Sequence, residues 1–171
     1  MRVLLVVLAL ALAGVARAEP VRETVIGTQV LSIVGRGASG SFERRVAKRW
    51  SAVALVGVRA AALVDFTSRT LWFGGEARFW IRGSTPMRGP FVALHASIGY
   101  TRLEDDAMGL VGSSIALSQR ADLGWRFTLW SRISVAPTIG LGTREDVDAS
   151  GRLATTVRPQ LGLGLEVGWL W

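Results

Sequence analysis

The chain has no cysteine and a single histidine among its 171 residues. It therefore has no disulfide framework and no thiolate metal ligands, and one histidine cannot supply a polyhistidine metal centre. Charged residues make up only 19% of the chain, while 50% of the residues are hydrophobic and the mean hydropathy is +0.36. This composition excludes disorder for the bulk of the chain, and the 20 glycines argue against a helical bundle. We expect one domain that is held by packing and hydrogen bonds, with no metal ion and no other cofactor.

The N-terminus has the three parts of a secretory signal peptide. Arg2 supplies the positive charge, Val3 to Val15 form a small and apolar run, and Ala16-Arg17-Ala18 is an A-x-A cleavage site. The apolar run is shorter than the roughly 20 residues that a membrane-spanning helix needs. The sequence therefore predicts a cleaved signal peptide, residues 1–18, and an exported domain, residues 19–171.

Basic residues outnumber acidic ones by 20 to 13, and the isoelectric point is about 11.4. A basic chain can bind nucleic acid, but the arginines are scattered along this one and an exported protein rarely meets nucleic acid. Only Arg44, Arg45, Lys48 and Arg49 cluster, which suits a solvated turn or a turn against anionic lipid headgroups. We expect no nucleic-acid partner.

Hydrophobic periodicity indicates the architecture. At the C-terminus bulky residues alternate with a glycine-rich face; the bulky set is Leu161, Leu163, Leu165, Val167, Trp169 and Trp171, and the other face is Gly162, Gly164, Glu166, Gly168 and Leu170. This stretch is longer than a usual strand of about 5 to 6 residues and matches the about 9 to 11 of a tilted membrane strand. Glycines inside and bulky apolar residues outside predict a narrow barrel that faces lipid.

Turn signals divide the rest of the chain into strands. Breaks near residues 47–49, 65–69, 83–89, 104–109, 129–132 and 143–151 give six strands from Trp50 onward. Bacterial barrels have an even number of strands with both ends periplasmic, so two further strands are expected at Thr24–Val34 and Gly40–Val46, joined at residues 35–38. The prediction is an all-β fold, a single antiparallel up-and-down transmembrane β-barrel of about eight strands, with six as the alternative.

Aromatic residues gather at the predicted periplasmic end. They are Trp50, Trp80, Trp125, Trp130, Trp169 and Trp171, with Phe79, Phe91 and Phe127 beside them. Such a set is typical of an interfacial girdle. Trp80 and Phe91 face inward by alternation and are expected to plug the lumen. Phe66, Trp72, Phe73 and Tyr100 are expected to form a thinner girdle at the other end.

Together, the signal peptide, the alternating strands, the girdle and the aromatic C-terminus resemble the small outer-membrane β-barrel proteins of the OmpA-barrel and OmpX-like group. The resemblance covers residues 19–171, with Trp171 where the family usually has Phe. It implies residence in the Gram-negative outer membrane, contact with outer-membrane lipid and lipopolysaccharide, and insertion by the barrel-assembly machinery. That machinery is expected to read Leu163, Leu165, Val167, Trp169 and Trp171. We expect a monomer with an envelope-structural or surface-binding role.

The expected lumen is polar. Inward positions with charge or imidazole are Arg59, Glu76, Arg78, His95, Arg120, Asp122 and Glu166. The interior of an eight-stranded barrel is just wide enough for side chains to fill it. We therefore expect these residues to form one layer of arginine–carboxylate pairs rather than to line a channel.

His95 and Ser97 are the only candidate catalytic pair, because a Ser beside a His can be an activated nucleophile. They resemble the His-x-Ser motif of the PagL-like lipid A deacylases, with Glu104 as the candidate acid, but Ile98 stands where that family has Asn. Alternation also points both side chains away from lipid. We favour a non-enzymatic protein. The alternatives are a lipid A-modifying enzyme, an exported soluble barrel that binds an apolar ligand, and a narrow pore.

Two acidic segments, Glu104–Asp106 and Glu145–Asp148, are expected in outer loops. Carboxylates suit hard divalent cations, and lipopolysaccharide carries such cations. A solvated loop is the favoured interpretation of both segments.

Overall fold

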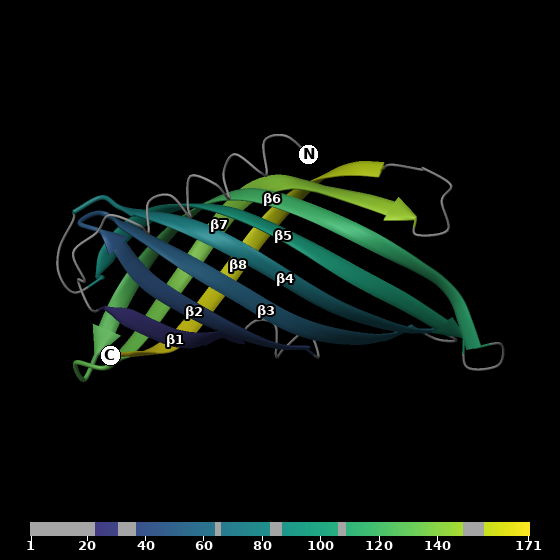
Figure 1. Ribbon diagram of the computed structural model, residues 1–171, viewed down its shortest axis with the longest axis horizontal. Helices are drawn as coiled ribbons and strands as arrows, with labels where there is room; N and C mark the ends of the chain where they lie inside the picture. Colours follow the sequence, from purple (N-terminus) through teal and green to yellow (C-terminus); the bar gives the residue numbers. More distant parts are fainter. Residues whose placement is uncertain (1–22, 31–36, 64–65, 83–86, 106–108, 149–155) are drawn as a thin grey trace.

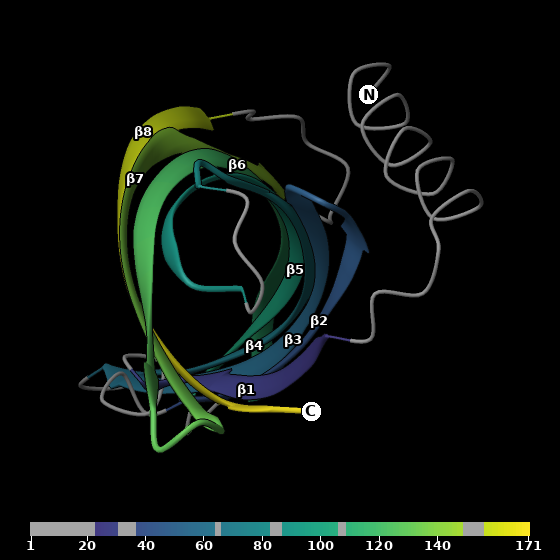
Figure 2. The same cartoon turned by 90° about the vertical axis from the view of Figure 1, so that its left-hand side faces the viewer.

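A computed structural model describes residues 23–30, 37–63, 66–82, 87–105, 109–148 and 156–171. Eight strands make up the fold: β1 (Thr24–Gln29), β2 (Gly37–Ala47), β3 (Trp50–Leu63), β4 (Phe66–Trp80), β5 (Gly89–Asp105), β6 (Gly109–Leu129), β7 (Ile133–Asp148) and β8 (Thr156–Leu170). Each strand pairs with the next, and β8 pairs antiparallel with β1, so the sheet closes into one barrel (Figures 1 and 2). The predicted all-β barrel of eight strands is confirmed. The predicted signal peptide lies outside the described residues.

None of the described residues belongs to a helix with the length and apolar character needed to cross a membrane.

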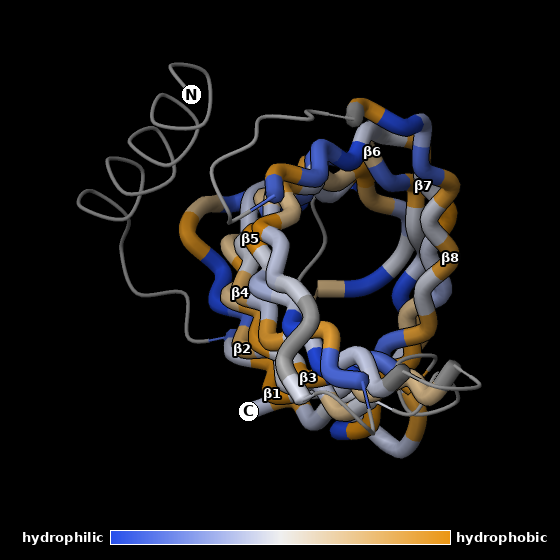
Figure 3. Tube along the Cα trace, turned by 90° about the vertical axis from the view of Figure 1, so that its right-hand side faces the viewer, coloured by the Kyte–Doolittle hydropathy of each residue, from blue (hydrophilic) through white to orange (hydrophobic). Residues whose placement is uncertain are grey.

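The period-2 pattern of the sequence appears in the structure as alternating burial. In β2, Ser41, Glu43 and Arg45 are buried inside the barrel, while Phe42 and Arg44 between them are exposed outside. Successive side chains of a strand point to opposite faces, so the closed sheet sorts them into a lumen and an outer wall. Figure 3 shows the resulting alternation of hydrophilic and hydrophobic positions around the barrel.

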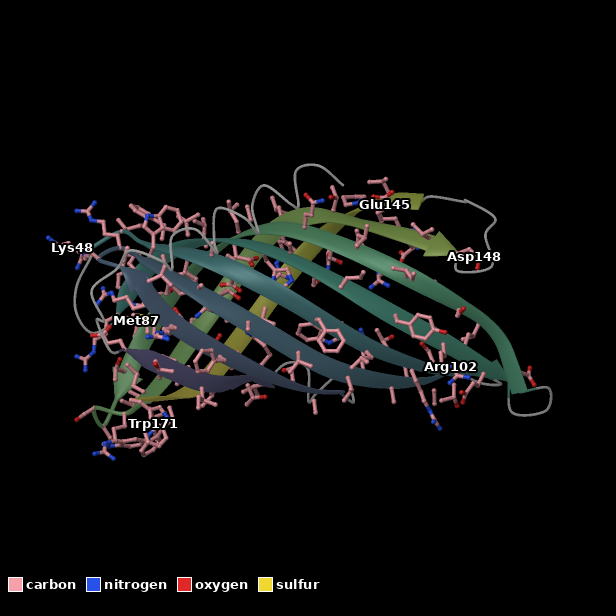
Figure 4. The ribbon with its side chains drawn as sticks, in the orientation of Figure 1. Lys48, Met87, Arg102, Glu145, Asp148 and Trp171 are labelled. Atoms are coloured by element: carbon pink, nitrogen blue, oxygen red, sulfur yellow. The ribbon has the colours of Figure 1, made fainter. Side chains whose placement is uncertain are left out.

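The two ends of the barrel differ. Lys48, Met87 and Trp171 lie at one of them, which we call the turn end, and Arg102 and Asp148 lie toward the far end (Figure 4). At the turn end β2 and β3 are joined through residues 48–49, and β6 and β7 through residues 130–132. The backbone N–H of Trp171 donates to the carbonyl of Thr24 across 2.9 Å, which brings the two described ends of the chain together there.

Strand boundaries at the far end differ from the prediction. β7 continues to Asp148 and β5 to Asp105, so most of the two expected acidic loops is strand, and β4 already begins at Phe66. β2 begins at Gly37, inside an expected turn, and β1 ends at Gln29; residues 31–34 lie outside the described residues. The turn signals failed because ladder pairing with a neighbouring strand overrides local propensity.

Glycines of the inner face accommodate large side chains from neighbouring strands. A Cβ on Gly57 would collide with the Trp72 indole, and one on Gly124 with the Phe91 ring. A glycine in a strand often marks such a close approach. Trp72 therefore fills the lumen, and its expected place in an outer aromatic girdle is wrong.

Candidate functional site

An apolar plug closes the lumen at the turn end. Trp80, Met87 and Phe91 are each no more than 1% exposed, and the rings of Trp80 and Phe91 lie 5.0 Å apart between centroids. The other members of the plug are Val25, Ala93, Ala136 and Leu170. The inward orientation of Trp80 and Phe91 agrees with the strand alternation.

Hydrogen bonds fasten the plug to the barrel wall. The backbone N–H of Met87, in the segment between β4 and β5, donates to Glu23 Oε2 across 3.0 Å. The same carboxylate accepts from Arg45 Nη1 at 3.0 Å, and the Trp80 indole N–H donates to Ser51 Oγ at 3.0 Å. Met87 is thus held inside the turn end.

A layer of buried charges, the charge layer, contains Glu43, Glu76, Arg78, Arg126 and Glu166. Arg78 donates to three carboxylates: Nε to Glu76 Oε1 at 2.5 Å, Nη1 to Glu43 Oε2 at 2.6 Å and Nη2 to Glu166 Oε2 at 2.8 Å. Arg126 Nη2 donates to Glu43 Oε2 at 2.6 Å and to Glu166 Oε1 at 2.9 Å. Burying charge is costly, and these short charge-assisted hydrogen bonds compensate for the lost hydration.

The charge layer packs directly on the apolar plug. The Arg78 guanidinium lies 4.9 Å from the centroid of Phe91, and that of Arg126 lies 5.3 Å from the centroid of Trp80. Cations are attracted to the faces of aromatic rings, which favours this stacking. Two successive layers of side chains therefore fill the lumen, and the arrangement suits a closed structural core better than a channel.

Five of the predicted inward residues fall into two groups. Glu76, Arg78 and Glu166 meet in the charge layer. Arg120 and Asp122 form a separate pair, with Nε donating to Oδ1 at 2.5 Å.

Arg59 lies in neither group, so its assignment to a shared layer is wrong. It is exposed and lines a small pocket of about 180 Å³ toward the far end with Ala61, Ser68, Thr70, Thr101 and Arg144. The prediction used only the face on which Arg59 lies, whereas the stagger of the strands decides its depth in the lumen.

Sequence reasoning missed Glu43 and Arg126 as members of the charge layer. The basic run Arg44-Arg45 masks the alternation of β2, so Glu43 had no clear face in the sequence. Arg126 does lie on the inward face of its predicted strand. The signal that would have found both is the alternation itself, extended to the positions nearest the turn end.

The candidate catalytic pair lies inside the lumen. His95 is on the inner face of β5, its side chain is 10% exposed, and its Nδ1 lies 3.9 Å from Glu76 Oε2. Glu104, the expected acid, instead lies toward the far end of β5, with its Oε2 3.9 Å from Arg69 Nε. Glu104 therefore cannot orient His95, and that part of the catalytic hypothesis is wrong. Glu76 is the carboxylate beside the imidazole, and it is already bound to Arg78.

The outer wall is apolar on every strand. Exposed large hydrophobic residues, one from each of β1 to β8, are Ile26, Phe42, Val56, Phe73, Leu94, Leu123, Leu141 and Leu163. Aromatic residues join them at the turn end, where Trp50 and Phe79 lie 5.1 Å apart between ring centroids and Trp130 is 83% exposed. The surface thus combines an apolar belt with aromatic residues at one end.

The residues of the predicted C-terminal assembly signal lie on β8 and just after it. Leu163, Trp169 and Trp171 are exposed on the outer wall, and Leu165 and Val167 are partly exposed. β8 is also the strand that closes the barrel against β1. The recognition of this segment by assembly machinery stays a prediction.

No cluster of three or more His, Asp or Glu residues that could hold a metal ion occurs within the described ranges. Neither protein-family models nor curated proteins nor solved structures show a match to this chain.

Proposed function

We propose that this protein is an integral outer-membrane β-barrel with a closed lumen and a non-enzymatic, envelope-structural or surface-binding role. One observation carries the proposal: apolar side chains are exposed on all eight strands, while Glu43, Arg78, Arg126 and Glu166 are buried at the centre. This distribution is the reverse of that in a protein that folds in water.

Physical chemistry supports a lipid environment for this surface. In water an apolar belt of this extent would drive aggregation, whereas acyl chains solvate it favourably. A closed barrel also pairs its backbone N–H and C=O groups within the sheet, as the interior of a bilayer requires. β2 to β8 have between 11 and 21 residues, enough for the about 9 to 11 residues that a tilted strand needs to cross.

The same geometry supports one orientation of the barrel in the membrane and argues against ion conduction through the lumen. Bacterial barrels place both chain ends in the periplasm, and the two described ends of the chain meet at the turn end, so the turn end is assigned to that side. The apolar plug and the charge layer fill the lumen on the periplasmic side. The proposal agrees with the resemblance to the OmpA-barrel and OmpX-like group.

Fractionation of expressing Gram-negative cells tests the proposal. We expect the protein in the outer-membrane fraction, as a band whose mobility on a gel changes with boiling. A band that stays soluble in the periplasm without detergent would contradict the proposal and would favour an exported soluble barrel.

A pair of matched variants sharpens this test. Leu163 and Val157 are 63% and 62% exposed, but Leu163 lies midway along β8 and Val157 near its far-end start. Leu163→Arg is expected to lower the unfolding free energy in vesicles by about 2 to 4 kcal/mol, and Val157→Arg by about 0 to 1 kcal/mol. Equal effects of the two substitutions would argue that the wall faces water.

The non-enzymatic part of the proposal is tested separately. Expression of the wild type and of His95→Ala is expected to leave the lipid A mass spectrum of the cells unchanged. Loss of an acyl chain with the wild type alone would instead establish a deacylase.

A further inference from the structure

Two outward arginines lie directly opposite each other where the apolar belt gives way to polar residues at the far end. Arg69 on β4 and Arg102 on β5 are register partners, and both are exposed. The next outward pair toward the middle of the wall is Leu71 and Tyr100, which are 42% and 44% exposed. The arginines therefore mark the edge of the lipid-facing surface that is nearest the far end (Figure 4, where Arg102 is labelled).

Inward neighbours confirm the face on which the arginines lie. Thr70 and Thr101, the pair between them and the Leu71–Tyr100 pair, hydrogen-bond to each other through their hydroxyl groups at 2.9 Å and line the lumen pocket. Because side chains alternate, Arg69 and Arg102 project from the outer wall.

This arrangement is electrostatically unfavourable unless an anion is present. Directly opposite residues have Cβ atoms about 4.5 to 5.5 Å apart, and like charges at such positions destabilise a sheet. Glu104 Oε2 lies 3.9 Å from Arg69 Nε, and an exposed pair at this separation is weak. Arg102 forms no ion pair with any residue in the described part of the chain.

An apolar groove of about 590 Å³ adjoins the two arginines on the outer wall. Val58, Leu71 and Tyr100 contribute its larger apolar side chains, and Ala38 and Ala60 contribute small ones. Arg69 and Arg102 themselves form part of its lining. The groove crosses β2 to β5 at the level of the arginines and of the next outward pair, since Ala60 is the register partner of Arg69 and Val58 that of Leu71. Cationic and apolar elements are thus adjacent, as an anionic amphiphile requires.

We infer that Arg69 and Arg102 together bind the phosphate monoester of an outer-leaflet lipid of the lipid A class, with one of its acyl chains in the groove. This inference rests on the proposed function, because the orientation places the far end in the outer leaflet. A phosphate monoester carries about −1.5 to −2 charge and three acceptor oxygens, which match two guanidinium groups. A glycerophospholipid diester carries about one negative charge and satisfies the pair less well.

Native mass spectrometry of the folded protein released from detergent micelles tests the inference. Micelles are supplied with diphosphoryl lipid A or with phosphatidylglycerol, and the bound fraction is compared. The wild type is expected to retain lipid A in preference. Arg69→Ala/Arg102→Ala is expected to lose at least about tenfold in lipid A binding, because two charge-assisted contacts disappear.

Matched variants control for charge. Arg44→Ala/Arg49→Ala removes the same charge at the turn end, where both residues are exposed, and is expected to bind lipid A like the wild type. Arg69→Lys/Arg102→Lys keeps the charge but loses the bidentate geometry and is expected to bind at an intermediate level. Equal binding by all four proteins, or equal binding of lipid A and phosphatidylglycerol by the wild type, would overturn the inference.

The urea midpoint of unfolding gives a second measurement, and a purely structural role of Arg102 would not produce the expected result. In detergent alone Arg102→Ala is expected to raise the urea midpoint, since it removes a repulsion; with lipid A present it is expected to lower the midpoint relative to the wild type. A lower midpoint in both conditions would contradict the lipid site. A heat-modifiable wild type that shows no lipid A preference would overturn this inference alone, whereas failure to insert would also overturn the proposed function.

Discussion

Arg78 donates a hydrogen bond to Glu43 across 2.6 Å, although 35 residues separate them in the chain. Their strands, β4 and β2, are not neighbours in the barrel, because β3 lies between them. Arg78 also reaches Glu166 on β8, at 2.8 Å. The charge layer therefore ties strands together through the lumen, in addition to the hydrogen bonds along the wall.

Glu43→Gln tests how much the charge layer contributes to the unfolding free energy. Glu43 is fully buried and accepts from Arg78, Arg126 and Ser51, so a neutral amide leaves buried cations without their carboxylate. We expect the unfolding free energy to fall by about 3 to 5 kcal/mol. Urea titration of the folded barrel in detergent, followed by tryptophan fluorescence, measures the change.

Glu104→Gln is the matched control, because it removes the same charge from a partly exposed ion pair with Arg69. We expect it to change the unfolding free energy by less than about 1 kcal/mol. Similar effects of the two substitutions would show that the charge layer is not a stabilising tie.

Gly124→Ala tests the fit of the apolar plug. The added methyl group would collide with the Phe91 ring, which is buried and packs against Trp80 with 5.0 Å between the ring centroids. Overpacking of this kind costs about 1 to 3 kcal/mol, which urea titration would resolve. Gly40→Ala is the control, since its Cβ would meet only Val56 Cγ1, at 3.8 Å.

Phe91→Leu in the Gly124→Ala background is expected to restore part of the lost stability. If the double variant lost the sum of the two single effects, the contact between Gly124 and Phe91 would not be the cause of the destabilisation.

Strand number was predictable because alternation is a local property of the sequence. In β8 the contrast between Leu161, Leu163 and the intervening Gly162 is strong enough to define both faces, and closure demands an even count. The far-end boundaries were not predictable in this way. Thr143 and Glu145 have turn-like neighbours, yet they pair with Pro159 and Val157 of β8, and only that long-range pairing keeps them in a strand.

Membership of the charge layer was predictable only in part. Alternation gives the face of a residue but not its depth, which depends on strand tilt and register. Arg59 and Arg78 both face inward, yet Arg59 pairs in register with Thr70 and Arg78 with Ser51, so they lie at different depths. The sequence alone contains no measure of that stagger.

Ser131→Gly is expected to stabilise the turn between β6 and β7. Ser131 has a φ of 65°, in the left-handed region, and the adjacent Trp130 has a φ of 46°. The left-handed conformation costs a residue with a Cβ about 1 to 2 kcal/mol, so glycine is expected to raise the unfolding free energy by up to about 1 kcal/mol after its own entropic cost. Ser131→Ala keeps the Cβ and should give no such gain in the same urea titration.

Because side chains fill the lumen, we expect the barrel not to conduct ions. Wild-type protein in planar bilayers is expected to show no steady single-channel conductance, because the apolar plug and the charge layer occupy successive levels. Trp80→Ala is also expected to show no conductance, since Arg78 and Arg126 remain in place in the adjacent charge layer. Regular conductance steps from the wild type would favour a pore.

Trp171→Ala separates assembly in the cell from stability. The Trp171 side chain is 74% exposed at the turn end, so its removal is expected to change the unfolding free energy of refolded protein by less than about 0.5 kcal/mol. If assembly machinery reads this residue, the amount of heat-modifiable protein in the outer membrane should nevertheless fall several-fold. Trp130→Ala is the matched control, because Trp130 is 83% exposed at the same end but lies outside the C-terminal segment. Equal losses for both variants would indicate a general need for interfacial tryptophan, and unchanged levels for Trp171→Ala would show that the terminal aromatic residue is not part of an assembly signal.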